Sequence, residues 1–363
     1  MSKILYRNIT IQNPFEDSFV SDMLVEDEKI SLIVREIDIS IADEVIDASN
    51  KMIFCGFIDR HTHGGYGCNF NTCDEKELQN YLVNARNHGV VAVLPTLMTD
   101  SIENINRQIS LLKNIESKGA KIIGVHLEGP FINPLKKGIH PSEYIFLPTI
   151  ENLDMFDTSF IKVLTYAPEL DENNEFLNEL KARNIIPSAG HTDATYAQAE
   201  NFARSGIKQV THLFNAMRPI HHREAGLITK ALNDDDFAVE IIADLQHVSR
   251  PVLDMLLKVK PKEKILFISD SLPISYSEKK EDIFGGQAIF YDGEKACSKN
   301  GTLAGSTLFL DDIYKRVSEF VSFRDFIGFA SKNIAESLNL KGFDVVKAGM
   351  NISDTVICDK NLL

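Results

Sequence analysis

The chain has 363 residues, of which 44% are hydrophobic and 25% charged, and its formal net charge at pH 7 is -14. This length has room for one large domain, or a large domain and a small one, and the hydrophobic fraction excludes a disordered chain. The negative charge disfavours nonspecific binding to nucleic acid or to an anionic membrane. An anionic substrate would therefore need a local group of cations.

The cysteine pattern and the first residues indicate a cytoplasmic protein. The five cysteines are odd in number and include no C-x-x-C pair, which favours reduced thiols. Met1 to Asn8 alternate in polarity and lack the apolar stretch of a signal peptide. No apolar run approaches the ~20 residues of a membrane-spanning helix. We therefore expect no membrane or nucleic-acid partner.

The two ends of the chain share a strand-like pattern. Lys3 to Gln12, Phe19 to Glu26 and Lys29 to Val34 are short, alternating and rich in β-branched residues. Met350 to Cys358 alternates again and is expected to pair with these N-terminal strands. The pattern predicts a small β-sandwich domain made of residues 1–50 and 338–363.

From Met52 onward, short apolar runs alternate with helix-length polar stretches. The predicted strands are Met52 to Asp59, Val90 to Leu97, Lys121 to Leu127, Phe160 to Tyr166, Ile185 to Ala189, Lys208 to Leu213, Phe237 to Ala243 and Ile265 to Ser269. The predicted helices between them are Asp74 to His88, Asp100 to Lys118, Glu172 to Arg183, Thr195 to Ser205 and Arg250 to Val259. Eight buried strands that alternate with helices predict an α/β fold, a (β/α)8 TIM-type barrel over residues 51–337.

The segment after the eighth strand is turn-rich. Gln287 to Tyr291 and Lys295 to Ser298 flank an Asp-Gly-Glu turn and predict a hairpin. Helices are expected over Thr307 to Phe320 and Phe323 to Leu338.

Histidines and carboxylates recur at the ends of the predicted strands. They are His61, His63, His126, Glu128, His191, His212, Asp244, His247 and Asp270. A single histidine at a strand end is more often structural than a ligand. Because barrel enzymes react at the carboxyl ends of their strands, the whole series converges on one face. This convergence favours a metal-assisted hydrolase.

The motifs suggest how these groups divide the chemistry. His61 and His63 point to the same side of an extended chain, so together they can chelate a divalent ion. Glu128 ends a buried strand, where a carboxylate is costly unless it is paired or metal-bound. Asp270 can take a proton from activated water and return it to a leaving group, and His247 can hydrogen-bond a substrate carbonyl. Asp244 is expected only to orient its neighbours.

Several cations could bind an anion such as phosphate. They are Lys136, Lys137, His140, Arg218, His221, His222, Arg223 and Arg250. Arginine can grip a phosphate through two hydrogen bonds. A solvated loop is an equally good reading of the run from His221 to Gly226.

The motifs together resemble one family. They are Gly56 to Gly65, His126 to Phe131, Lys136 to His140, Gly190 to Thr195, Thr211 to Met217, His221 to Gly226 and Leu303 to Ser306. In this order, over about residues 51 to 310, they resemble the N-acetylglucosamine-6-phosphate deacetylases of the amidohydrolase superfamily. The resemblance implies metal-dependent conversion of N-acetyl-D-glucosamine 6-phosphate to D-glucosamine 6-phosphate and acetate, in amino-sugar catabolism.

The resemblance also implies roles for individual residues. Glu128, His191 and His212 would hold the first metal ion, and His61 and His63 would complete a second site. The ion would be zinc, with iron, manganese or cobalt as alternatives. Water activated by the metal would attack the acetamide carbonyl, with Asp270 as acid and base and His247 polarising the carbonyl. The residues implied in substrate binding are His140, Ile139, Asn215, Ala216, Arg223, His247, Leu303, Ala304 and Gly305. Arg223 would bind the phosphate of the neighbouring subunit in a homodimer.

The chain departs from the family pattern at a few positions. Arg60 stands where a small apolar residue is common, Ala225 replaces a usual proline, and Ser269 to Pro273 differs from the usual Thr-Asp-Ala. None of these changes removes a proposed catalytic group.

Three other functions stay open on sequence alone. The first is deacetylation of N-acetylgalactosamine 6-phosphate. The second is another amidohydrolase that acts on a cyclic or linear amide. Many of those use a carbamylated lysine on the fourth strand, but here the carboxylate is Glu128 on the third strand, and Lys162 lies at the wrong end of its strand. The third is a non-enzymatic relative, which the intact metal and acid/base positions disfavour.

Overall fold

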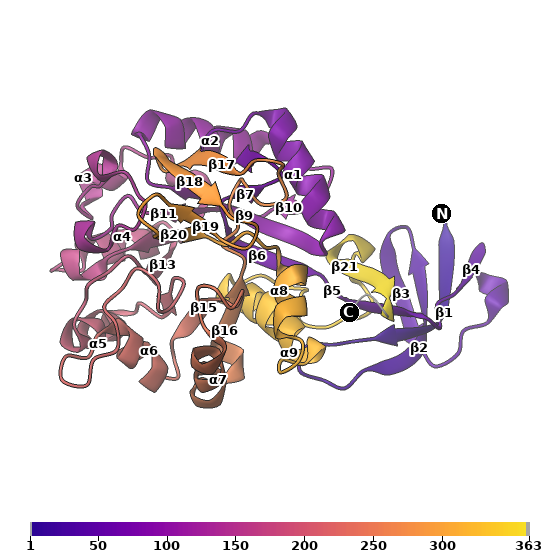
Figure 1. The fold of residues 1–363 in the computed structure, drawn as a ribbon. Coiled ribbons are helices and arrows are strands. Elements are labelled where there is room, and N and C mark those ends of the chain that lie inside the picture. Colours follow the sequence, from indigo (N-terminus) through magenta and orange to yellow (C-terminus); the bar gives the residue numbers. More distant parts are fainter. Residues whose placement is uncertain (1, 361–363) are drawn as a thin grey trace.

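The structure, a computed structural model that describes residues 2–360, has two parts (Figure 1). Strands from both ends of the chain form a small sheet on one side. The middle of the chain forms a much larger α/β barrel (Figure 1).

The small part is one six-stranded sheet in the order β21-β5-β1-β2-β3, with β4 paired to β1. Its strands are β1 (Lys3–Ile11), β2 (Phe19–Glu26), β3 (Lys29–Val34), β4 (Glu44–Asp47), β5 (Lys51–Cys55) and β21 (Thr355–Asp359). Strand β21 runs antiparallel to β5, so the chain does return to its N-terminal region as expected. The strands are connected by hydrogen bonds into one continuous sheet, in which β1 pairs with β4 along its first half and with β5 along its second.

The large part contains eight parallel strands. They are β6 (Phe57–Thr62), β9 (Val90–Met98), β11 (Val125–Glu128), β12 (Ile161–Tyr166), β13 (Ile186–Ala189), β14 (Gln209–Val210), β15 (Ala238–Ile242) and β16 (Ile265–Ile268). Each pairs in parallel with the next. The backbone N–H of Asp270, just after β16, donates to the carbonyl of His61 on β6 at 2.8 Å. This contact brings the last strand back to the first and confirms the TIM-type barrel.

Helices surround the strands. They are α1 (Glu75–Asn87), α2 (Ile102–Asn114), α3 (Ile150–Leu153), α4 (Glu175–Ala182), α5 (Tyr196–Ser205), α6 (Leu227–Asn233), α7 (Arg250–Val259), α8 (Leu310–Val317), α9 (Phe323–Ile327) and α10 (Asn333–Ser337). Asp74 with Glu77, and Thr195 with Gln198, form capping boxes that fix where α1 and α5 begin. Among residues 2–360, no helix combines the length and apolar character that a membrane span requires.

Two of the predicted strands are each divided into two separate strands in the structure. The run Met52 to Asp59 is divided into β5, which belongs to the small sheet, and β6, which belongs to the barrel. The run Lys121 to Leu127 is divided into β10 (Lys121–Ile122) and β11, because Gly124 adopts a φ of 141° that breaks the strand. Apolar character continues through both breaks, so periodicity alone could not show them.

The last predicted helix, Phe323 to Leu338, is also interrupted. A π-helical turn over Gly328–Lys332 separates α9 from α10. The ring of Phe15, from the small part, occupies the space beside Gly328 that a Cβ atom would need, 2.2 Å from where that atom would lie. The glycine therefore lets the N-terminal segment pack directly on the helix.

We propose that both boundaries between the two domains lie a few residues further along the chain than the sequence predicts. On the N-terminal side, Ile53 packs with the core of the small sheet, whereas Ile58 packs inside the barrel. On the C-terminal side, Phe343 packs with the barrel and Val346 with the small sheet.

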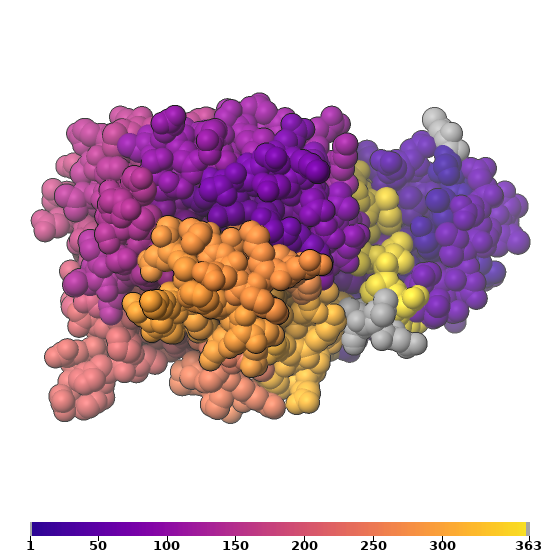
Figure 2. Space-filling model, turned by 45° about the horizontal axis from the view of Figure 1, so that its top comes forward, coloured from indigo at the N-terminus to yellow at the C-terminus, as the bar shows by residue number. Residues whose placement is uncertain are grey.

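A second small sheet lies over the barrel. It contains β17 (Glu281–Phe284), β18 (Gln287–Tyr291), β19 (Ala296–Ser298) and β20 (Leu303–Gly305), all antiparallel. The antiparallel pairing of β18 and β19 confirms the predicted hairpin. In Figure 2 these residues, in orange, lie across the face of the barrel. This sheet forms part of the wall around the barrel mouth.

A buried lysine gives the fold a testable pH dependence. Lys260 is 3% exposed, and its ammonium donates to the carbonyls of Ala231 and Asp234, at the end of α6, at 2.8 and 2.6 Å. Burial lowers the pKa of Lys260 to about 8. Between that pH and the ordinary lysine pKa, the unfolded chain binds more protons than the folded one, so the free energy of unfolding should rise with pH.

In a Lys260→Met variant this rise should be smaller. Near neutral pH two effects oppose each other, because the two helix-end carbonyls lose their donor, at a cost of about 1–3 kcal/mol, while a buried charge that costs stability is removed. Urea unfolding at pH 7 and pH 10 measures both effects. The same substitution at the exposed Lys258 controls for the change in net charge, and equal slopes in all three proteins would contradict this role for Lys260.

Candidate metal centre and active site

The side chains that follow the barrel strands meet at one mouth of the barrel. They surround a cavity of about 240 Å³. Its lining includes His63, Glu128, Ile139, His140, His191, His212, Asn215, Ala216, His247, Asp270, Leu303, Ala304 and Gly305. His61 lies fully buried beside this cavity, within 3.6 Å of Glu128. The structure thus brings together the residues that the family resemblance implied for metal binding, catalysis and substrate binding, with one exception.

The exception is Arg223. It lies in an exposed loop between β14 and α6, and it is not among the residues that line the cavity. In the described part of the chain its guanidinium contacts only the ring of the adjacent His222, at 3.0 Å. A role for Arg223 in this subunit's own site has no support from its position.

Glu128 is the centre of the cluster. Its Oε1 lies 3.0 Å from Nε2 of His191 and 2.9 Å from Nε2 of His212. The two imidazole nitrogens are themselves only 3.1 Å apart. Three donor atoms this close together, from β11 and from the segments after β13 and β14, have the spacing of ligands around one ion.

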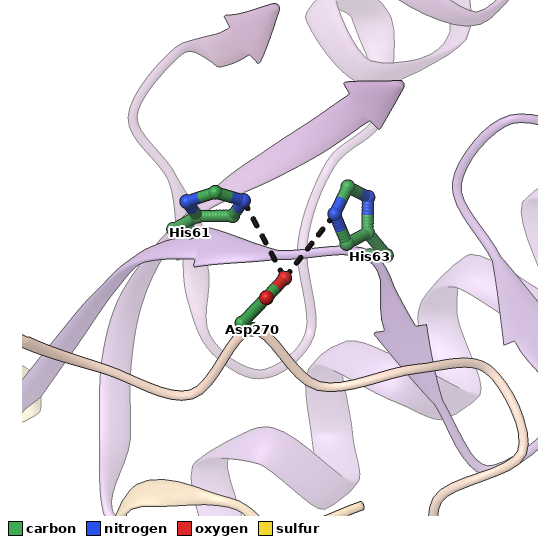
Figure 3. A group of neighbouring side chains, drawn as sticks. All are labelled: His61, His63 and Asp270. Atoms are coloured by element: carbon green, nitrogen blue, oxygen red, sulfur yellow. Dashed lines mark ion pairs between the residues drawn. The ribbon is translucent and has the colours of Figure 1, made fainter. Parts of the chain in front are cut away.

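A second group adjoins the first. His61 Nε2 and His63 Nε2 lie 3.5 and 3.3 Å from Oδ1 of Asp270, as the dashed lines in Figure 3 show. The other oxygen of Glu128 lies 3.2 Å from His63 Nε2. Glu128 therefore lies between the two groups and could be shared by two ions.

The hydrogen bonds behind the imidazoles show that the cluster suits a cation. His191 Nδ1 and His63 Nδ1 lie 2.9 and 3.2 Å from the backbone carbonyls of Lys136 and Thr96. A carbonyl can only accept, so each Nδ1 carries a proton and each Nε2 is the nitrogen that faces Glu128, with either a proton or a bound cation between the two. Lone pairs that face carboxylate oxygens repel them unless a positive charge lies between. The donor set therefore fits a divalent metal ion.

Both carboxylates at the centre are ionised. Burial alone would raise the pKa of Glu128, but the charge of His61 and the hydrogen bonds from neighbouring imidazoles hold it well below its usual range. Burial likewise raises the pKa of Asp270. The charge of His61, together with the hydrogen bond and charge of His63, outweighs burial and lowers the pKa of Asp270 below its ordinary value. Two ionised carboxylates in a buried site are the charges that a divalent ion neutralises.

The backbone is unusual where three of these residues stand. His191, His212 and Asp270 have φ values of 47°, 29° and 50°, in the left-handed region that side-chain-bearing residues rarely adopt. Each of them stands two residues after the end of a parallel strand. Such strain gathers at functional sites, where the surrounding fold holds it in place.

His247 is held by Asp244. Its Nδ1 lies 2.8 Å from the Asp244 carboxylate, which also accepts the backbone N–H of His247. Burial alone would lower the pKa of His247, but the hydrogen bond and charge of Asp244 outweigh it and raise the pKa above the ordinary value. The protonated ring can then donate from Nε2 to a substrate oxygen, and Asp244 orients it.

Two histidines differ from simple expectation. His140, suggested only for substrate binding, has its Nε2 3.5 Å from Glu128, and it forms a possible ligand group with Glu128 and His191. His126 instead lies inside the barrel, 2.7 Å from the hydroxyl of Thr165. Burial lowers the pKa of His126 to about 3, so it is neutral and belongs to the interior.

Sequence reasoning missed part of the cavity wall. Met98, Ile242 and Phe284 also line it, and the ring of Phe284 lies 5.1 Å from that of His63. Met98 and Ile242 belong to apolar runs and Phe284 to a turn-rich segment, so nothing in the sequence distinguishes them from ordinary packing residues.

A parallel barrel whose strand ends carry a buried glutamate among histidines, with an aspartate after the eighth strand, defines a metal-dependent amidohydrolase. None of the protein-family models matches the chain. Individual relatives do match. The N-acetylglucosamine-6-phosphate deacetylase of Bacillus subtilis is 33% identical over 328 residues, which cover 87% of this chain and 83% of the relative. The chain therefore belongs to the family of N-acetylglucosamine-6-phosphate deacetylases.

Solved structures agree with this assignment. The N-acetylglucosamine-6-phosphate deacetylase of Thermotoga maritima is 30% identical, with a TM-score of 0.86 over 99% of this chain and 96% of that one. A mutant of the Mycobacterium smegmatis enzyme, in complex with N-acetyl-D-glucosamine-6-phosphate, is 25% identical, with a TM-score of 0.87 over 99% and 96%.

Proposed function

We propose that this protein hydrolyses the acetamide of N-acetyl-D-glucosamine 6-phosphate to D-glucosamine 6-phosphate and acetate, as a step in amino-sugar catabolism. The observation that carries the proposal is the cluster in which Glu128 lies within 3.0 Å of two imidazoles while Asp270 lies 3.3 Å from a third. We also propose a cytoplasmic location, which the free cysteines support, because disulfides are rare in that compartment.

In this function Glu128, His191 and His212 would hold a divalent ion, and His61 and His63 would provide ligands for a second. Zinc suits this set of imidazoles and carboxylates best, and iron, manganese or cobalt are alternatives. Bound there, such an ion acidifies water and polarises a carbonyl oxygen.

Asp270 moves the proton. Its carboxylate takes a proton from the attacking water as the new C–O bond forms at the acetyl carbon. It then gives that proton to the amide nitrogen as the C–N bond breaks, so the sugar leaves as an amine and the acetyl group as acetate. A carboxylate that is ionised in the resting site is in the correct state to begin as the base.

His247 stabilises the oxygen that becomes negative. Its Nδ1 is held by Asp244, so its Nε2 can donate toward the acetyl carbonyl. Because the donor is fixed before the reaction, it favours the charged tetrahedral state over the neutral amide.

The remaining residues around the cavity bind the sugar and its phosphate. We assign contacts with the sugar and acetyl group to His140, Asn215, Ala216 and the segments at Ile139 and Leu303 to Gly305, all of which line the cavity. Arg223 lies outside the cavity, and we assign it to the phosphate in the site of a partner subunit of a homodimer.

The proposed reaction is tested by measuring acetate released from N-acetyl-D-glucosamine 6-phosphate by purified protein, before and after treatment with a chelator. We expect turnover that the chelator removes and Zn²⁺ restores. The unphosphorylated sugar should react far more slowly. The galactosamine isomer, assayed beside it, decides the epimer. Turnover of neither phosphorylated sugar would contradict the proposal.

The shared site predicts a complementation experiment. Arg223→Gln should raise KM for the phosphorylated sugar by about 10–100-fold, because one charged hydrogen-bonding group is lost. Mixing this variant with an Asp270→Asn variant, after unfolding and refolding together, should recover activity. Hybrid dimers then contain one site with both an intact Asp270 and an intact Arg223 from the neighbour. Arg204→Gln, on the exposed face of α5, is the matched control, and no recovery on mixing would contradict the assignment of Arg223 to the partner's site.

A further inference from the structure

Two oppositely charged residues lie buried inside the barrel, next to the candidate metal site. Arg60 on β6 is 0% exposed and Glu240 on β15 is 1% exposed. The guanidinium Nε of Arg60 lies 2.8 Å from Oε1 of Glu240. The two terminal nitrogens of Arg60 donate to Ser337 Oγ at 2.6 Å and Gln209 Oε1 at 2.7 Å. Two hydrogen bonds and one ion pair therefore hold the guanidinium.

Glu240 connects this pair to the candidate metal site. Its second oxygen, Oε2, lies 3.0 Å from Nδ1 of His61. Since an ionised carboxylate only accepts, His61 carries its proton on Nδ1. The other ring nitrogen of His61, Nε2, is buried and makes no hydrogen bond within the described chain. It faces Glu128 at 3.6 Å and Asp270 at 3.5 Å.

We propose that Arg60 and Glu240 are positioning residues that fix the ring and tautomer of His61, so that its Nε2 lone pair is ready for a metal ion. The inference rests on the proposed metal-dependent function and adds residues to it. His191 and His63 take their orientation from backbone carbonyls, whereas His61 takes it from a carboxylate. Arg60 keeps that carboxylate charged and oriented, because a carboxylate in a dry barrel interior is costly without a partner.

The same residues do not form a metal site of their own. His61, His126 and Glu240 offer ligand atoms within 4.8 Å of one another. However, Glu240 is already paired with the guanidinium of Arg60, whose positive charge would repel an ion at that point. The ring of His126 is occupied by the hydroxyl of Thr165 and the carbonyl of Arg60. Glu240 therefore acts as the hydrogen-bonding partner of His61, and Arg60 as the ion-pairing partner of Glu240, and neither acts as a metal ligand.

Glu240→Gln is the first test. The charged guanidinium should attract the amide oxygen and leave the amide N–H₂ facing His61 Nδ1, which must then accept. The proton moves to Nε2, the nitrogen needed for the ion. A wrong tautomer of this kind is the effect of an amide that replaces a carboxylate behind a catalytic histidine. We expect the affinity for Zn²⁺ at the His61–His63 position to fall by about 10–100-fold.

Two measurements report this change without relying on turnover. Calorimetric titration of the metal-free protein with Zn²⁺ gives the affinities, and the weaker binding step should move while the Glu128–His191–His212 step changes less. Nitrogen-15 spectra of histidine-labelled protein in the presence of Zn²⁺ show whether Nδ1 of His61 carries a proton, which is expected in the wild type and not in the variant. Asp22→Asn, which alters a buried carboxylate in the small sheet, controls for a general loss of stability.

A double variant separates positioning from a merely structural role. Arg60→Met with Glu240→Leu replaces the buried pair with apolar side chains of similar size, which often restores stability. If the pair only supports the fold, this protein should be stable and bind Zn²⁺ as the wild type does. If the pair positions His61, stability should return but Zn²⁺ affinity should stay about 10–100-fold weaker, because the acceptor behind His61 is gone.

The outcomes can be told apart from failure of the proposed function. Acetate release by the wild type tests the function, and the Zn²⁺ titrations of the variants test the positioning. A wild type that turns over the sugar while both variants keep its Zn²⁺ affinities would overturn the positioning role alone. So would a wild type in which His61 Nδ1 carries no proton.

Discussion

Replacing Glu128 with glutamine should remove metal binding and reduce acetate release by more than about 10³-fold, because loss of several kcal/mol of metal-derived stabilisation corresponds to at least that factor. Glu128 is 3% exposed and, among residues 2–360, is the one carboxylate that approaches both groups of imidazoles. Glutamine keeps the shape of the side chain but not its charge, so the histidines around it lose the negatively charged ligand that would help them to bind an ion.

Metal content of the purified variant, measured by mass spectrometry, checks this directly. Thermal unfolding gives a second readout, since an ion that binds only the folded protein raises its stability. Added Zn²⁺ should raise the unfolding midpoint of the wild type and leave that of Glu128→Gln unchanged. Glu169→Gln is the matched control, because Glu169 also lies near the barrel mouth but accepts hydrogen bonds from Asn133 and Asp193 rather than from imidazoles. Full metal content in Glu128→Gln would show that Glu128 is not the central ligand.

The barrel could be predicted from the sequence because its strands are buried on both faces. Runs such as Val90 to Leu97 are apolar at all but one position and buried along their whole length, which is the pattern of a parallel strand covered by helices. The same property concealed the boundary between the two parts of the chain. Met52 to Asp59 reads as one apolar run, yet β5 pairs with the small sheet and β6 with the barrel. Only tertiary pairing distinguishes the two.

The cluster was predictable for a different reason. Histidines and acids at strand ends meet because parallel strands of a barrel all finish on one face, and that rule needs no knowledge of individual contacts. The residues behind the cluster lacked such a rule. Glu240 lies 179 positions from His61, and Arg60 reads as an odd residue in a strand until the barrel closes and brings the two together. A glutamate inside the apolar run Val239 to Ile242 was the one signal that pointed to it.

Asp270→Asn should lower kcat by about 10²–10⁴-fold, which is the usual contribution of a positioned acid/base group. Asparagine can neither take the proton from water nor return it to the amide nitrogen. The Asp270 carboxylate is ionised in the resting site, held so by the charge of His61 and by His63, and the substitution removes that charge while keeping the shape of the side chain. KM should change much less than kcat, because the proton transfer is needed in the transition state and not for binding the sugar.

The assignment depends on where the loss of activity comes from. Asp270 Oδ1 lies 3.3 Å from His63 Nε2, so the substitution could also weaken a metal ion. Metal content measured on the same preparation separates the two causes: an acid/base role requires that activity falls while the ion at Glu128, His191 and His212 stays bound. Asp171→Asn, which changes a buried aspartate at the start of α4, shows the cost of losing a carboxylate elsewhere. Near-normal turnover by a metal-loaded Asp270→Asn protein would show that another group transfers the proton. His247, the titratable side chain assigned to the substrate carbonyl, would then be the next residue to replace.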